Sequence, residues 1–180
     1  MNDSLETAVL GGGCFWCLEA VFMEVDGVHE VTSGYAGGQR ERPTYAQVCS
    51  GASGHAEVVR LRFDPAVVSY EALLDVFFSI HDPTQLNRQG NDVGPQYRSA
   101  IMPQDEEQER IAREAVRAQD ESGVWQGPVV TTIEPGVRFW PAESEHQDFF
   151  RRNTFQPYCQ FVIAPKLKHA RETCPARMRS

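Results

Sequence analysis

Cys14 is the residue whose surroundings in this sequence most favour chemistry. It follows three consecutive glycines at 11–13 and precedes the aromatic pair Phe15 and Trp16. The residues before the glycines favour a short strand and those after the aromatic pair a helix, so the thiol is expected where a strand turns into a helix. The free N–H groups and partial positive charge of a helix start favour the thiolate, the reactive form of cysteine. We therefore predict that Cys14 is a nucleophile; the alternative is a small core residue after a tight turn.

The helix start alone is too weak to make Cys14 fully anionic. An unperturbed cysteine with a pKa of about 8.5 is only a few per cent thiolate at pH 7. A helix end contributes about 0.3–1 kcal/mol, which lowers the pKa by less than about one unit. A hydrogen bond or the bound substrate must therefore supply the rest.

Glu57 is the second residue expected to take part in chemistry. Segment 55–63 alternates, and Glu57 shares one face of the expected strand with the apolar residues Val59, Leu61 and Phe63. Raising a glutamate pKa from about 4.3 to about 7 takes roughly 4 kcal/mol, which burial can supply. The prediction is a desolvated carboxylic acid that keeps its proton; the alternative is a strand-end side chain that reaches solvent.

The five cysteines leave the partner of Cys14 open. Cys14 and Cys17 form a C-x-x-C pair, which is typical of dithiol redox chemistry or half a zinc site, although the bulky residues between them are unusual for a redox pair. A zinc site would need Cys159 and Cys174, whose spacing is loose, so no metal is expected. The simplest alternatives are that Cys17 faces the core and that Cys49 is a plain buried thiol in a strand at the edge of a loop.

The composition describes an acidic globular protein. The 180 residues suffice for one domain with a full core, and the net charge of -8 argues against nucleic acid and anionic membranes as main partners. No cationic region followed by an apolar one begins the sequence, and no apolar run could span a bilayer, so neither a secretory signal nor membrane insertion is expected. The odd, thinly spaced cysteines favour a reducing cytoplasm.

Strand and helix patterns are mixed along the chain as in an α/β (α+β) protein. Strands are expected at 7–10, 28–35, 55–63, 97–102 and 129–134, and helices at 18–22, 104–119, 143–152 and after the potential cap Ser69. A long polar loop precedes Tyr97, and residues 153–180 are expected to form an irregular tail with an extended piece at 161–163. The expected fold is a single domain, 1–180, a two-layer sandwich around a mixed or antiparallel sheet with flanking helices.

These segments together resemble the A-type peptide methionine sulfoxide reductases. Segments 13–16, 45–51, 54–57, 92–99, 139–147 and 165–167 match that family in order. The resemblance implies reduction of the S epimer of methionine sulfoxide, free or in proteins, to methionine. It also implies the family's ferredoxin-like plait.

The resemblance assigns the chemistry to four residues. Cys14 would attack the sulfoxide sulfur, Glu57 would protonate the sulfoxide oxygen, and Tyr45 and Tyr97 would hydrogen-bond that oxygen. The roles of Cys14 and Glu57 agree with the chemistry of their side chains, because a sulfoxide oxygen is a poor leaving group unless it is protonated.

The resemblance also implies a substrate pocket. Phe15 and Trp16 would form the apolar wall for the substrate methyl group, and Asp92 and His146 would orient the backbone around the oxidised methionine. Taken alone, the polar segments 91–98 and 139–147 read as surface loops and a helix start.

Three positions depart from the family pattern. Pro95 stands where threonine is common, Trp140 where tyrosine is common, and Glu145 where a tyrosine commonly precedes the histidine. None of these removes a group assigned to the chemistry. The departures at Pro95 and Glu145 leave open which contacts this chain makes with a peptide substrate.

Recycling requires a second cysteine. Attack leaves a sulfenic acid on Cys14, which condenses with another thiol to give a disulfide and water. By resemblance Cys159, carried by a flexible tail, is the resolving cysteine and thioredoxin the external reductant, with no cofactor and a monomeric enzyme. Cys17 and Cys174 stay open as alternatives, although cysteines on one helix turn often fit disulfide geometry poorly.

Two other classes of function remain. A general dithiol-disulfide oxidoreductase would use Cys14 and Cys17 and would tolerate loss of Glu57. A non-enzymatic zinc or peptide-binding module would explain the aromatic pair. A peptide-binding pocket would leave the glycine–cysteine turn and Glu57 unexplained.

Overall fold

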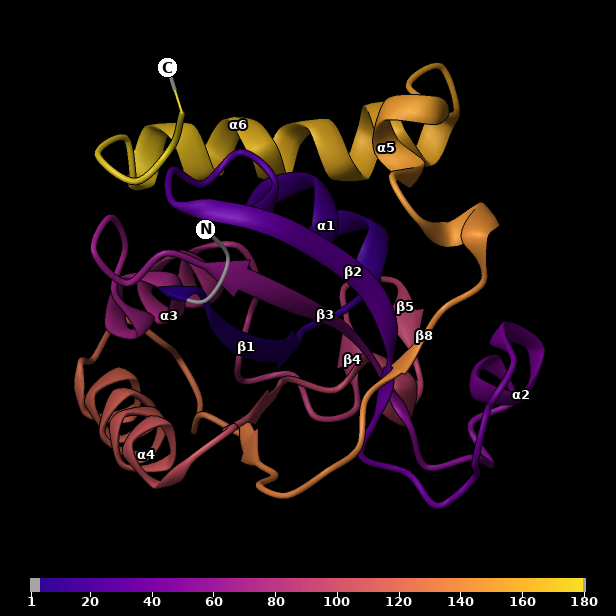
Figure 1. Cartoon of the computed structure of the whole chain (residues 1–180), viewed down its shortest axis with the longest axis horizontal. Coiled ribbons are helices and arrows are strands. Elements are labelled where there is room, and N and C mark those ends of the chain that lie inside the picture. Colours follow the sequence, from indigo (N-terminus) through magenta and orange to yellow (C-terminus); the bar gives the residue numbers. More distant parts are fainter. Residues whose placement is uncertain (1–3, 180) are drawn as a thin grey trace.

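The computed structural model describes residues 4–179, which form one main sheet with helices packed on it (Figure 1). The strands are β1 (Glu6–Gly11), β2 (Val28–Ala36), β3 (Ala56–Phe63), β4 (Arg88–Gln89), β5 (Asp92–Val93), β6 (Ala100–Met102), β7 (Thr132–Ile133) and β8 (Trp140–Pro141). The α-helices are α1 (Phe15–Phe22), α2 (Tyr45–Cys49), α3 (Tyr70–Ser79), α4 (Glu106–Glu121), α5 (Phe149–Arg152) and α6 (Ala164–Thr173). Short 3-10 turns η2 (Pro95–Tyr97) and η3 (Ser144–His146) and a π-helical turn η4 (Cys159–Ile163) complete the chain.

The main sheet has the strand order β7-β6-β1-β3-β2-β8. Its neighbouring strands pair antiparallel, except for β6 and β7, which pair parallel. The expected α/β class, with a mixed sheet flanked by helices, is therefore confirmed. The more specific plait arrangement stays a prediction.

The alternation of β3 separates the two layers. Val59 and Leu61 are fully buried in the main core together with the residues of α1 and α3. Val58 points to the opposite face, where Val137 and Phe139 close a smaller cluster. The helices thus cover one face of the sheet, and the segment leading into β8 crosses the other. Glu57 shares the helix-covered face, because side chains two residues apart in a strand point the same way.

Helix starts follow the local rules that the sequence suggests. Ser69 caps α3 by accepting a hydrogen bond from the Ala72 amide, as expected. Thr44 begins α2 with a capping box, an element that the sequence reading did not foresee. The strand expected around Cys49 is therefore wrong, and Cys49 is the half-buried last residue of α2.

The C-terminal segment differs most from expectation. The expectation of an irregular tail over 153–180 is wrong, since η4 and α6 make most of it helical. The expectation of an extended piece at 161–163 is also wrong, because these residues belong to η4. Cys159, Ile163 and Ala170 are fully buried in the main core, so tertiary packing stabilises helices that have no capping side chain of their own. Figure 1 shows α6 lying across α1 and β2.

The helix expected at 143–152 is interrupted. It consists of η3 and the short α5, separated by Asp148 in a left-handed conformation with φ of 55°. Within the described residues, no helix is long and apolar enough to cross a membrane. The expectation about a secretory signal rests partly on residues 1–3, which lie outside the described part of the chain.

We expect Leu61→Ala to lower the free energy of unfolding by about 2–5 kcal/mol, because it opens a cavity in the core. Leu61 is fully buried beneath the helices. Urea denaturation measures the change. Val67→Ala, at a side chain that is 52% exposed, is the matched control and should shift stability by less than about 0.5 kcal/mol. Equal effects at the two positions would contradict this account of the core.

Candidate functional site

Cys14 lies at the turn from strand to helix, as predicted. β1 ends at Gly11, and Cys14 is the N-cap of α1, with extended backbone angles (φ -68°, ψ 129°). Gly13 before it has φ of 89°, which favours glycine, and its amide donates to the Tyr97 carbonyl at 3.2 Å. This turn places the thiol against the core, where Cys14 is only 6% exposed.

Glu57 is fully buried beside this turn. Its Oε1 accepts a hydrogen bond from the Phe15 amide at 3.0 Å, and its Oε2 has no partner within residues 4–179. Burial raises the pKa of Glu57 to about 8, although the Phe15 amide acts in the opposite direction. The alternative of a solvent-reaching carboxylate is therefore wrong, and Glu57 holds a proton at neutral pH that it can donate.

Cys14 and Cys17 form a coupled thiol pair. Burial, a hydrogen bond with Cys17 and the nearby Glu57 hold the pKa of Cys14 above its usual value. The hydrogen bond from Cys14 lowers the pKa of Cys17, and the positive charge of Lys166 acts in the same direction. In the resting site Cys14 is thus a thiol, and Cys17 is the sulfur that ionises more readily.

An aromatic wall of five rings surrounds the start of α1. We use this name for Phe15, Trp16, Tyr45, His146 and Phe149. Trp16 stacks on Phe149 with ring centroids 3.7 Å apart and planes 6° apart, and Tyr45 stacks on His146 at 4.2 Å. The Trp16 Nε1–H donates to His146 Nδ1 at 3.3 Å. The structure thus brings Phe15, Trp16 and His146 together, as the resemblance implied, and adds Phe149.

Tyr45 and Tyr97 reach the site from α2 and η2. Burial, followed by the nearby Glu57, raises the pKa of both phenols, so both remain hydroxyl donors. The two elements are tied together, because the Gln96 side-chain amide donates to the Cys49 carbonyl at 3.2 Å.

Glu143 anchors this side of the site. Its carboxylate accepts from the Tyr35 hydroxyl at 2.8 Å and from the Tyr45 amide at 2.9 Å. The interpretation of segment 139–147 as a surface loop and helix start did not indicate these contacts. Only the fold brings it to Tyr45, 98 residues away in the sequence.

Tyr158 is the functional candidate that sequence reasoning missed. Its hydroxyl donates to Asp92 Oδ2 at 2.9 Å and lies 3.6 Å from Cys17 Sγ. Asp92 therefore acts on the thiol pair through Tyr158. The available sequence signal was the position of Tyr158 directly before Cys159.

The three candidate resolving thiols lie in different elements. Cys17 is the hydrogen-bond partner of Cys14. Cys159 is fully buried in η4. Burial raises the pKa of the Cys159 thiol, and the charge of Cys17 raises it further. Cys174 caps the far end of α6, where its thiol donates to Ser79 Oγ at 3.7 Å. The ten residues of α6 put Cys174 about 15 Å along the helix from η4.

The three departures from the family pattern have local structural roles. Pro95 starts η2, where a missing N–H is tolerated. Trp140 in β8 lies under the Arg138 guanidinium, whose carbon is 4.0 Å from the ring centroid. Glu145 lies in η3 on the surface. Over residues 4–179, no group of three His, Cys, Asp or Glu side chains is arranged to hold a metal ion.

Comparison with known proteins identifies the family. A family model described as peptide methionine sulfoxide reductase matches residues 6–178. The chain belongs to this family.

Relatives of this family match along nearly the full length. Peptide methionine sulfoxide reductase MsrA of Ralstonia nicotianae is 56% identical over 183 residues, covering 99% of this chain and 96% of that protein. Among solved structures, methionine sulfoxide reductase A of Corynebacterium diphtheriae is 36% identical with a TM-score of 0.80, covering 86% of this chain and 77% of that one. Reduced Mxr1 of Saccharomyces cerevisiae is 31% identical with a TM-score of 0.79, covering 87% and 90%.

We expect Glu57 to make stability depend on pH. The folded protein keeps the Glu57 proton up to about pH 8, whereas the unfolded chain loses it near pH 4.5. Between these values the folded state binds more protons, so the free energy of unfolding falls as pH rises. The free energy of unfolding of the wild type, relative to that of Glu57→Gln, should fall by up to about 1.4 kcal/mol per pH unit. Urea unfolding of both proteins across this window measures the difference, and parallel profiles would contradict a protonated Glu57.

Proposed function

We propose that this chain reduces the S epimer of methionine sulfoxide, free or in proteins, through a sulfenic acid on Cys14. The observation that carries this proposal is the pairing of a thiol at the start of α1 with a buried, protonated Glu57 whose Oε2 is unpartnered among the described residues. A nucleophilic sulfur and a neutral acid are the two groups that removal of a sulfoxide oxygen requires.

The chemical step is an attack by Cys14 Sγ on the sulfoxide sulfur. Attack forms a bond between Cys14 Sγ and the substrate sulfur while Glu57 gives its proton to the sulfoxide oxygen. The sulfur–oxygen bond then breaks and the hydroxyl group passes to Cys14 Sγ as the sulfur–sulfur bond breaks, so methionine leaves with the electron pair of that bond. The proton of the Cys14 thiol replaces the one that Glu57 gave. Methionine sulfoxide is reduced to methionine while Cys14 is oxidised to the sulfenic acid. Because burial keeps Cys14 protonated at rest, the thiolate forms only with the substrate in place.

The surrounding side chains orient the substrate. We assign the methyl group to the aromatic wall at Phe15 and Trp16, and the sulfoxide oxygen to the hydroxyls of Tyr45 and Tyr97. The raised pKa values of both tyrosines support this assignment, since neutral phenols can donate to an oxygen that gains negative charge. Asp92 contributes through Tyr158.

For recycling, we propose that Cys17 forms the first disulfide with Cys14. Their thiols are hydrogen-bond partners, and Cys14 precedes the first turn of α1 in an extended conformation, which removes the objection that two cysteines share one helix turn. The lowered pKa of Cys17 also favours attack on a sulfenic acid. That reaction forms the sulfur–sulfur bond and releases water.

Cys159, the resolving cysteine implied by resemblance, receives the disulfide in a second exchange. It lies near enough to Cys17 for the charge of that sulfur to raise its pKa. Attack by Cys159 on Cys17 frees Cys14 for another turnover, and a dithiol protein of the thioredoxin type then reduces the Cys17–Cys159 bond. Mxr1 of Saccharomyces cerevisiae, solved in complex with Trx2, shares this fold at 24% identity with a TM-score of 0.55, covering 81% of this chain and 85% of that one.

The proposed setting is a monomer in the reducing cytoplasm, with oxidised proteins or free methionine sulfoxide as substrate. Five free cysteines support a reducing compartment. The net charge of -8 supports a protein that binds neither nucleic acid nor anionic membranes.

We expect Cys14→Ser to abolish reduction of the S-sulfoxide and Glu57→Gln to lower the single-turnover rate at least about a hundredfold, since the amide cannot donate a carboxylic proton. Rapid-quench measurement of methionine formed from a sulfoxide-containing peptide tests both variants. Retained activity in Cys14→Ser would exclude this nucleophile, and a Glu57→Gln rate within about threefold of wild type would exclude the acid.

We expect Cys17→Ser to make one methionine per enzyme and then stop in the presence of thioredoxin, thioredoxin reductase and NADPH. In Cys159→Ser, mass spectrometry after one equivalent of sulfoxide should find the Cys14–Cys17 disulfide. A Cys14–Cys159 bond in the wild type, together with multiple turnovers by Cys17→Ser, would instead make Cys159 the direct resolving residue.

The thiol contact of Cys14 and Cys17 also suits a general dithiol oxidoreductase. That class would reduce protein disulfides without an acid, so Glu57→Gln would be as active as wild type on insulin. A wild-type protein that reduces sulfoxide but leaves insulin intact excludes this second class.

A further inference from the structure

Glu19 is a buried carboxyl that the chemistry above does not use. It lies on α1, three residues after Trp16, and is 2% exposed. Its Oε1 accepts a hydrogen bond from the Phe149 amide at 3.2 Å, which crosses 130 residues of sequence. Burial raises its pKa, while hydrogen bonds from the main chain of Asp148 and Phe149 act in the opposite direction.

The main chain that Glu19 holds also carries part of the aromatic wall. Asp148 has a left-handed backbone, and Phe149 directly after it begins α5. The Phe149 ring stacks on Trp16, and His146 accepts the Trp16 Nε1–H bond. Because residues three apart lie on the same helix face, Trp16 and Glu19 bind one chain segment side by side.

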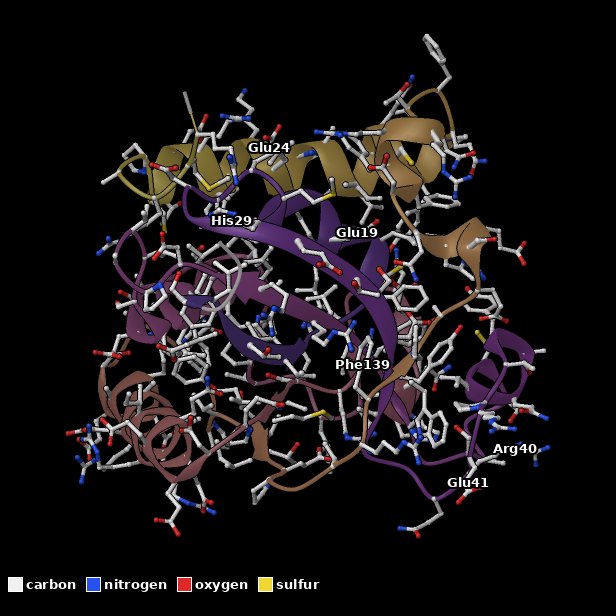
Figure 2. The ribbon with its side chains drawn as sticks, viewed as in Figure 1. Glu19, Glu24, His29, Arg40, Glu41 and Phe139 are labelled. Atoms are coloured by element: carbon white, nitrogen blue, oxygen red, sulfur yellow. The ribbon has the colours of Figure 1, made fainter. Side chains whose placement is uncertain are left out.

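A second glutamate near the end of the same helix gives a comparison. Glu24 follows the end of α1, and its carboxylate pairs with Arg171 of α6 at 3.3 Å. Figure 2 labels both residues, with Glu19 toward the end of the molecule that carries α5 and Glu24 beside α6. Both carboxyls join the α1 region to the C-terminal part, but only Glu19 contacts the segment of the aromatic wall.

We propose that Glu19 is a positioning residue for the methyl pocket: its carboxyl fixes the main chain at Phe149 so that Phe149 and His146 lie against Trp16. This inference rests on the proposed function, because it assigns the wall to the substrate methyl group. Without the carboxyl, the Phe149 amide loses its buried acceptor, and the segment 146–149 can move away from Trp16. The pocket then widens although Cys14 and Glu57 keep their positions.

The test uses three variants of Glu19 in the full chain. Glu19→Gln keeps an acceptor oxygen at the same reach, Glu19→Asp keeps a carboxyl group but withdraws its oxygens by one methylene, and Glu19→Ala removes the acceptor altogether. We expect KM for S-methionine sulfoxide to rise on the order of tenfold in the Asp and Ala variants, as for loss of one buried hydrogen bond, with the saturated single-turnover rate within about threefold of wild type. The Gln variant should recover most of the affinity.

Selectivity separates a pocket effect from general destabilisation. The preference for the methyl over the ethyl sulfoxide should fall in Glu19→Asp but not in Glu24→Ala, which loses an interaction outside the wall. Unchanged KM and selectivity in Glu19→Asp, or the same changes in Glu24→Ala, would overturn the proposal.

Hydrogen exchange gives a readout that does not depend on catalysis. Amides of 146–152 should exchange faster in Glu19→Asp than in Glu19→Gln, and equal exchange would overturn the proposed contact. If the wild type failed to reduce sulfoxide, the proposed function would be wrong, whereas the exchange comparison would still decide whether Glu19 holds this segment.

Discussion

The hydrogen bond from the Phe15 amide to Glu57 Oε1 joins the start of α1 to β3 inside the core. It uses one carboxyl oxygen and leaves the other unpartnered among the described residues, so burial acts on the carboxyl with little compensation. That imbalance keeps Glu57 protonated at neutral pH. The bond also ties the first residue of α1, directly after Cys14, to β3.

The remaining groups of the site depend on this fixed helix start. Trp16 and Glu19 project from α1 and hold the segment of His146 and Phe149, while Cys17, one turn after Cys14, meets Tyr158. Glu57 of β3, the segment 146–149 and Tyr158 thus all contact the first two turns of one helix. The two cysteines ionise differently. Burial and the hydrogen bond with Cys17 hold the pKa of Cys14 above its usual value, whereas the hydrogen bond from Cys14 lowers the pKa of Cys17 although burial acts in the opposite direction.

Local patterns predicted the parts of the fold that short-range physics controls. The strand–turn–helix around Cys14, the Ser69 cap and the alternation that buries Glu57 are confirmed, because turn chemistry, capping and period-two burial act within a few residues. The C-terminal helices were missed because η4 and α6 have no capping side chain, and burial of Cys159, Ile163 and Ala170 stabilises them instead. The break at Asp148 was missed for a related reason, since Glu19 holds that backbone from another element.

The sequence by itself determined the family and singled out Cys14 and Glu57 as the candidate nucleophile and acid, since the glycine–cysteine turn, the face of Glu57 and the matching motifs are local features. Only the tertiary structure decided which thiol lies next to Cys14, that Tyr158 links Asp92 to Cys17, and that Phe149 completes the aromatic wall. These are contacts between distant segments, and they depend on how α1 packs against the C-terminal helices. Propensity and periodicity describe neighbours along the chain, whereas pKa values and hydrogen-bond partners follow from neighbours in space.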